Sequence, residues 1–199
     1  MRVGRFAFGA LACVLVLSGC AVLGGGSKPL DTFELTAVSP AAGHARTTRR
    51  QVLVAEPTAL KALDSESIVV KPSAKSIQYL GGAQWADRLP RIVQARLAET
   101  LQRSGRFGGV GRPGDGLAID YQVLTDIRSF EVRLDGGNRA EVQLFVQLLN
   151  DRNGVVRASR LFTAAAPVSG EGADAFVAGL DSAFHKAALE IVDWLTPLI

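Results

Sequence analysis

The sequence predicts an α/β fold: a single domain in which a mixed, mostly antiparallel sheet is flanked by two main helices as layers of a sandwich. Two observations lead to this prediction. Residues 117–167 alternate apolar and polar side chains in three segments separated by Gly- and Asn-containing turns, which is typical of an antiparallel meander. Residues 87–104 and 172–198 instead repeat apolar side chains every three or four positions, as amphipathic helices do.

The N-terminus precedes this domain and has a different character. Arg2 and Arg5 are followed by an uncharged, mostly apolar run, residues 6–17, and then by Leu17-Ser18-Gly19-Cys20. A basic start, a short apolar run and small residues predict a secretory leader. The run is too short to cross about 30 Å of hydrocarbon comfortably, which takes about 20 residues.

The four residues 17–20 resemble the lipobox of bacterial lipoproteins. In such proteins the cysteine thiol receives a diacylglyceryl group, and cleavage makes that cysteine the first residue. The resemblance implies a signal peptide over residues 1–19 and lipid attachment at Cys20. The alternatives are an ordinary leader with a chance cysteine and an uncleaved membrane anchor.

Residues 20–31 predict a flexible tether, because Gly24-Gly25-Gly26 gives this segment little stiffness. The eleven residues 21–31 span at most about 35–40 Å when fully extended. Removal of 19 residues from 199 leaves 180, which is enough for one domain, residues 32–199, with a substantial core.

Charge and cysteine content exclude several classes of function. The chain has 22 Lys and Arg against 19 Asp and Glu, and without Arg2 and Arg5 the balance is 20 against 19, or +1. A nearly neutral domain has no electrostatic footprint for nucleic acid. Cys13 falls in the leader and Cys20 at the lipid site, so the mature protein is expected to have no disulfide, no thiol chemistry and no cysteine-ligated metal.

The first half of the domain predicts short strands. Their ranges are 32–38, 51–55, 67–71 and 75–80, with a helical turn at 59–63 and a turn at Pro72-Ser73. Gly81-Gly82 is expected to open a loop that contains Trp85. A helix then follows, with Asp87 as its cap, Pro90 in its first turn and Gly105 as its left-handed end.

The second half predicts the meander and a closing helix. Residues 107–110 are a candidate strand and residues 108–116 a turn; the latter contain a Gly-x-Gly-x-x-Gly match that no helix follows, so it does not predict a dinucleotide site. The strand from Leu117 changes its apolar parity near Arg128-Ser129, which predicts a bulge. Turns at 135–138 and 151–154 separate the three strands, and the last helix covers 172–198.

No residue pattern indicates catalysis. The chain has two histidines, His44 in a polar loop and His185 on the last helix, and neither belongs to a metal-spaced or triad-like set. Asp120 and Asp126 share a strand face but stand about 20 Å apart, too far for a carboxylate pair. We therefore expect no enzyme activity, no metal site and no cofactor.

The whole mature chain resembles the ABC-type transport auxiliary lipoprotein family, which accompanies MCE-type lipid transport systems of double-membrane bacteria. The residues that carry the resemblance are the lipobox, Phe33-Glu34-Leu35, Trp85-Ala86-Asp87-Arg88-Leu89-Pro90, the helix ending at Ser104-Gly105-Arg106-Phe107, and the turn at 151–154. The resemblance implies a non-catalytic lipoprotein facing the periplasm. It also implies an MCE-domain protein, a permease and an ATPase as partners, and a phospholipid or sterol-like cargo.

Three questions stay open at this point. The alternative function is a structural lipoprotein that assembles an outer-membrane machine without handling lipid; a homo-oligomer with a ring interface would favour this alternative. We favour the outer membrane because Ala21-Val22 lack the Asp that favours inner-membrane retention in many enteric-type bacteria.

Tyr79 and Trp85 are candidate partner-binding residues, because large aromatic side chains dominate many interfaces; the alternative for Trp85 is a plug over the core.

Overall fold

The computed structural model describes residues 29–40 and 47–199. The predicted signal peptide, Cys20, nearly all of the predicted tether and His44 lie outside the described residues.

The fold is built on a long antiparallel meander of three strands, as the alternation predicted. These are β7 (Tyr121–Arg133), β8 (Arg139–Asn150) and β9 (Val155–Pro167). The register of β7 against β8 shifts between Ile127 and Ser129, which confirms the predicted bulge. However, β7 begins four residues later than predicted. Gly114 and Gly116 have positive φ angles of 97° and 73°, a conformation that ends regular extension in the segment before the strand.

The free side of β7 pairs with three short strands in succession, all parallel to it. They are β2 (Gln51–Val54), β3 (Thr58–Ala59) and β4 (Ser67–Ser73). The sheet continues with β5 (Ser76–Trp85) antiparallel to β4, β1 (Asp31–Phe33) parallel to β5, and β6 (Gly109–Gly111) parallel to β2. The result is one mixed, nine-stranded sheet, so the predicted fold class is confirmed.

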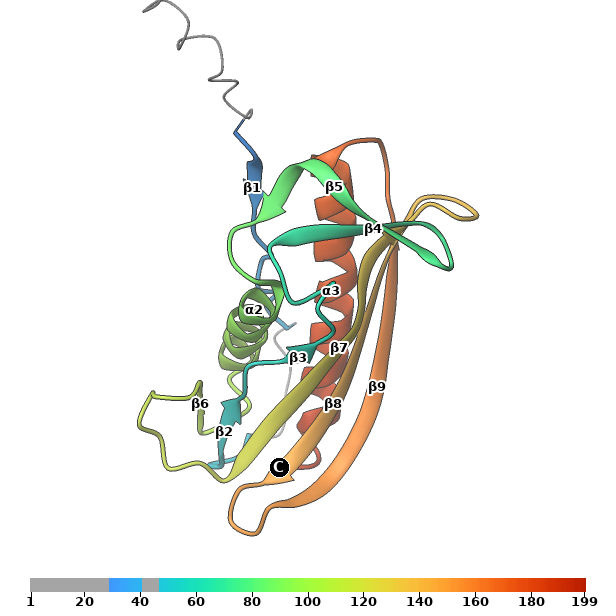
Figure 1. Ribbon diagram of the computed structural model, residues 1–199. Coiled ribbons are helices and arrows are strands. Elements are labelled where there is room, and N and C mark those ends of the chain that lie inside the picture. Colours follow the sequence, from blue (N-terminus) through green and yellow to red (C-terminus); the bar gives the residue numbers. More distant parts are fainter. Residues whose placement is uncertain (1–28, 41–46) are drawn as a thin grey trace, which may run out of the picture.

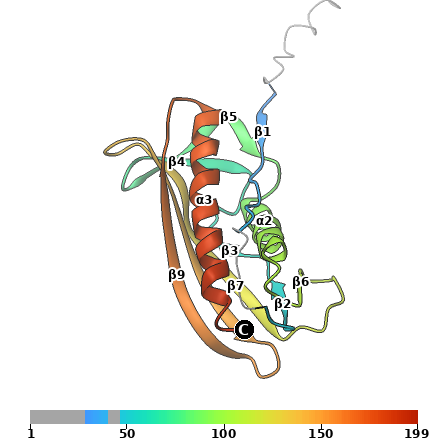
Figure 2. The same cartoon turned by 180° about the vertical axis from the view of Figure 1, so that it is seen from behind.

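Two helices cover one face of this sheet. The helix α3 (Ala173–Leu195) runs along the concave side of the meander, and α2 (Leu89–Ser104) lies beside it next to β2 (Figures 1 and 2). The predicted apolar face of α2 is buried, with Val93, Leu97 and Leu101 at 0% exposure. The convex side of the meander carries no helix within the described residues (Figure 1).

Several boundaries differ from the sequence-based expectation. Gly81-Gly82 does not open a loop, because β5 continues through both glycines to Trp85. The predicted strand 32–38 ends at Phe33, and the predicted helical turn at 59–63 is a short bridge followed by a turn. β6 occupies part of the predicted turn 108–116 because Gly109 and Val110 pair with β2.

The ends of the helices were predicted with mixed success. Gly105 has φ 62° and forms the left-handed cap of α2, as expected. Asp87 was expected to cap the start of α2, but the capping residue is Arg88, without a side-chain cap. The carboxylate of Asp87 instead accepts a hydrogen bond from the amide of Arg88 at 2.7 Å. The last helix ends at Leu195 and stops short of Pro197.

Neither α2 nor α3, the helices of the described residues, combines the length and apolarity needed to cross a bilayer.

Candidate functional site

Trp85 is part of the core rather than of a surface. Its side chain is 1% exposed, and its ring meets that of Phe130 edge-on with centroids 6.0 Å apart. Its backbone amide donates to the carbonyl of Glu66 at 2.7 Å. The predicted docking role of Trp85 is therefore corrected, and the alternative of a core plug describes it. Tyr79, the second predicted contact residue, is 55% exposed on β5 and remains open to a partner.

The segment after β1, residues 34–37, is fastened to α2 by two arginines. We call this segment the strap. Arg96 donates from Nε to the carbonyl of Leu35 at 2.7 Å and also pairs with Glu34 at 2.8 Å. Arg103 donates to the carbonyl of Ala37 at 2.7 Å. Since Leu35 is fully buried, the strap is held by both packing and charge-assisted hydrogen bonds.

The strap is also fastened to α3, through Thr36. Asp181 accepts hydrogen bonds from the amide of Thr36 at 2.8 Å and from its hydroxyl at 2.7 Å. Nε2 of His185 lies 2.8 Å from the same hydroxyl and 3.1 Å from the carbonyl of Thr36. His185 is thus a residue that joins the N-terminal segment to the last helix. The sequence placed His185 only on the last helix, because its partner is 149 residues away.

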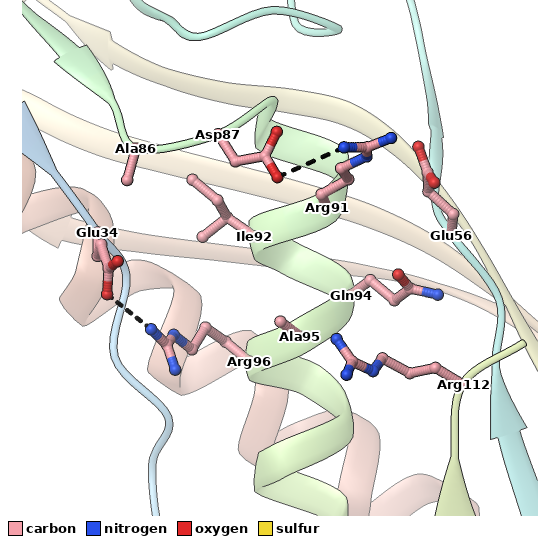
Figure 3. A pocket seen from close by; sticks show the side chains of 10 residues that line it. All are labelled: Glu34, Glu56, Ala86, Asp87, Arg91, Ile92, Gln94, Ala95, Arg96 and Arg112. Carbon is pink, nitrogen blue, oxygen red and sulfur yellow. Dashed lines mark hydrogen bonds and ion pairs between the residues drawn. The ribbon is translucent and has the colours of Figure 1, made fainter. Parts of the chain in front are cut away.

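A polar pocket lies between the strap, the first half of α2 and the loop after β6. Its volume is about 340 Å³, and Figure 3 shows that charged side chains of both signs surround it. The lining residues are Glu34, Glu56, Ala86, Asp87, Arg91, Ile92, Gln94, Ala95, Arg96 and Arg112.

Most charges of this pocket are already neutralised by a neighbour. Arg96 pairs with Glu34, and Arg91 stands 3.7 Å from Asp87 (Figure 3). Gln94, which is 9% exposed, donates from Nε2 to the carbonyl of Val54 at 3.0 Å and so ties α2 to β2. A lining of paired charges suits water and polar groups, and it does not suit an acyl chain. Neither Arg91 nor Arg96 belongs to a motif of the sequence, so the pocket was not foreseen from the sequence.

Asp120 joins three separate parts of the chain. Its carboxylate accepts hydrogen bonds from Arg50 at 2.9 Å, from the amide of Gln51 at 3.0 Å and from Arg152 at 3.1 Å. The hydrogen bond from Gln51 lowers the pKa of Asp120, and the guanidinium groups of Arg50 and Arg152 lower it further. An aspartate held ionised in this way fixes β2 to the start of β7. Asp126 pairs with Arg128 instead, so the two carboxylates do not share a site.

The convex face of the meander is partly apolar. Leu161 is 43% exposed there, next to Phe145, over whose ring the guanidinium of Arg128 lies at 4.2 Å. A shallow pocket of about 230 Å³ opens between Phe145, Leu124 and Thr58. Among the described strands, β9 forms the edge of the sheet, because it pairs with β8 alone. Both features suit contact with a second surface.

Within residues 29–40 and 47–199, no three His, Cys, Asp or Glu side chains gather as a metal site requires.

Residues 33–192 match the family described as ABC-type transport auxiliary lipoprotein component. The chain belongs to this family. The match covers almost all of the folded domain, from β1 to the end of α3. The family's description is that of a transport component rather than of an enzyme, and it assigns the chain to the cell envelope.

Solved structures support the fold of this family member. The crystal structure of protein XCC0632 from Xanthomonas campestris is similar, with a TM-score of 0.77 and 27% identity over 84% of this chain and 95% of that one. A second crystal structure, of an uncharacterized protein, has a TM-score of 0.67 at 16% identity, covering 84% of this chain and 99% of the other. The second likeness concerns the fold alone.

A curated relative extends the comparison to sequence. The chain is 31% identical over 181 residues to an uncharacterized protein of Bradyrhizobium diazoefficiens. The aligned part is 90% of this chain and 49% of the relative, so the chain spans about half the length of that protein.

Proposed function

We propose that the chain is a non-catalytic lipoprotein, anchored through Cys20 on the periplasmic side of the outer membrane, that serves an MCE-type lipid transport system. Family membership is the observation that carries this proposal, because it covers residues 33–192 and describes an auxiliary component of ABC transport. The lipobox-like Leu17-Ser18-Gly19-Cys20 supplies the anchor. An MCE-domain protein, a permease and an ATPase are the proposed partners.

The surfaces of the domain support an auxiliary role in contact and placement. The pocket in Figure 3 is lined by paired charges, and the pocket beside Phe145 is shallow and about 230 Å³ in volume. Neither encloses a volume of apolar lining that suits a whole lipid, whereas the convex face and the edge strand β9 offer area for a partner. We therefore propose that the chain positions other components, and that lipid passes through those components.

A second candidate function rests on the same edge strand. The thirteen residues of β9, paired on one side only, also fit a structural lipoprotein of an outer-membrane machine that handles no lipid.

Affinity purification from membranes in mild detergent separates the two candidates. The full chain, tagged at its C-terminus, is expected to retain an MCE-domain protein, a permease and an ATPase. A matched Cys20→Ala variant, which lacks the proposed anchor, should no longer retain these three proteins. Retention of outer-membrane assembly proteins alone would favour the structural role and contradict the transport proposal.

A further inference from the structure

Exposed apolar side chains gather on two neighbouring hairpins at one end of the domain. Ile77 is 51% exposed and Tyr79 55%, and both point to the same side of β5 because they are two residues apart. Leu134, at the turn between β7 and β8, is 37% exposed. We call these three residues, together with Lys75, the tip patch.

The two hairpins are joined, so the tip patch surrounds one shared tip. The register places Ile77 and Tyr79 on the face of Glu131 and Leu134 on the opposite face, so the patch covers both faces of this tip. The amide of Leu134 donates to the carbonyl of Lys71 on β4 at 3.0 Å, and β4 pairs with β5 next to Ile77 and Tyr79. Figures 1 and 2 show the β4–β5 and β7–β8 turns side by side in both views. Beyond Leu80, the outer edge of β5 is covered by β1, which pairs with residues 83–85 only. No other described strand pairs with the outer edge of the first half of β5, which lies beside the tip patch.

The chain leaves the domain toward its N-terminus in the same half of the domain. In Figure 1, β1 and the two turns lie in the upper half but on opposite sides, whereas the β8–β9 turn lies at the lower end. β1 pairs with residues 83–85, at the far end of the strand that carries Ile77 and Tyr79. The two ends of the domain are separated by about the length of α3, whose 23 residues span about 35 Å. Residues 21–31 reach at most about 35–40 Å, so an anchor at Cys20 keeps the tip patch within reach of the bilayer.

The chemistry of the tip patch matches a phospholipid surface. Tyrosine prefers the interface between membrane and water, because its ring is apolar and its hydroxyl is polar. Isoleucine and leucine side chains can enter the outer part of the acyl-chain region. Lys75, at the β4–β5 turn, makes no ion pair among the described residues and is free to meet lipid phosphates. Asp135, which follows Leu134 in the chain, is neutralised by Arg133, whose hydrogen bond lowers the pKa of Asp135.

We propose that the tip patch rests on the surface of the membrane to which the chain is anchored. This inference depends on the proposed lipid anchor at Cys20. With the anchor and the patch both engaged, the domain has a fixed orientation. The β8–β9 turn and the adjacent part of the convex face then point away from the bilayer, toward the space where other components stand.

Single introduced cysteines test the proposal, because the chain has only Cys13 and Cys20 and neither is expected to be a free thiol in the mature protein. The variants Ile77→Cys and Leu134→Cys probe the patch, and Leu161→Cys, 43% exposed on the convex face, is the matched control. Each full-length lipoprotein is spin-labelled and reconstituted in vesicles of phosphatidylethanolamine and phosphatidylglycerol. Accessibility to oxygen and to a water-soluble nickel complex is then measured by electron paramagnetic resonance.

We expect the ratio of oxygen to nickel accessibility to rise several-fold at positions 77 and 134 relative to position 161. Equal, water-like ratios at all three positions would overturn the proposal, as would burial at position 161 alone. Protection of position 77 only after an MCE-domain protein is added would also overturn it, in favour of a protein partner.

The anchor is checked separately, so the two failures are distinguishable. Protein without introduced cysteines should take no label, and mass spectrometry should find acyl chains on Cys20. A free thiol at Cys20 would refute the anchor and the proposed function. An acylated Cys20 with position 77 in water would refute only the membrane contact.

Discussion

Replacement of Trp85 by alanine tests whether this residue is a plug over the core. The side chain is 1% exposed and packs edge-on against Phe130. Removal of such a ring costs about 3–5 kcal/mol, since the cavity that remains adds to the lost burial. With a urea m-value of about 2 kcal/mol per molar, the unfolding midpoint should fall by roughly 2 M.

The assay is urea unfolding followed by far-ultraviolet circular dichroism, because the substitution itself changes the fluorescence. Tyr79→Ala is the matched control: its side chain is 55% exposed, so the free energy of unfolding should change by less than about 0.5 kcal/mol. A loss below about 1 kcal/mol for Trp85→Ala would refute the core role. Equal losses for both variants would show that exposure does not distinguish the two positions.

Three further predictions concern the helix core, the anchor and the response to acid. Leu97→Ala should lower the free energy of unfolding by about 2–5 kcal/mol, since Leu97 is fully buried on α2, and a change below about 0.5 kcal/mol in urea would contradict this packing. Cys20→Ala should abolish acylation and release the protein from washed membranes; a variant that stays bound through high salt would show another anchor. The depressed pKa of Asp120 means that its contribution to stability is present above the unfolded value of about 4 and is lost as pH falls through the folded value. Asp120→Asn should therefore destabilise the protein at pH 7 and much less at pH 2 in thermal unfolding scans, whereas an equal loss at both values would refute the ionic role.

The parts of the fold that were predicted correctly are those in which neighbours in sequence are neighbours in space. The meander and both helices have strong local periodicity. The bulge near Arg128-Ser129 was visible because the apolar side chains change from one set of alternate positions to the other there. The parallel strands β2, β3 and β4 were seen only as short apolar runs. Nothing in their own residues indicates that all three pair with one side of β7.

The site was harder to foresee for two reasons. Gly81-Gly82 suggested a loop, and only the pairing of β5 with β1 and β4 shows that the strand continues and buries Trp85. The strap depends on polar contacts between Thr36 and Asp181, which are 145 residues apart. No spacing rule connects residues at that separation, so their role becomes visible only in three dimensions.

The strap also determines how the domain responds to tension applied through its N-terminal segment. A pull on the N-terminal segment of an anchored protein first reaches β1, where only three residues are paired with β5. Behind β1, the hydrogen bonds of Arg96, Arg103 and Asp181 attach the chain to two helices at once. The hydrogen bonds to α2 and α3 therefore share the load, so they do not break one at a time. Tension on the N-terminal segment is therefore expected to separate β1 from β5 before it reaches the core.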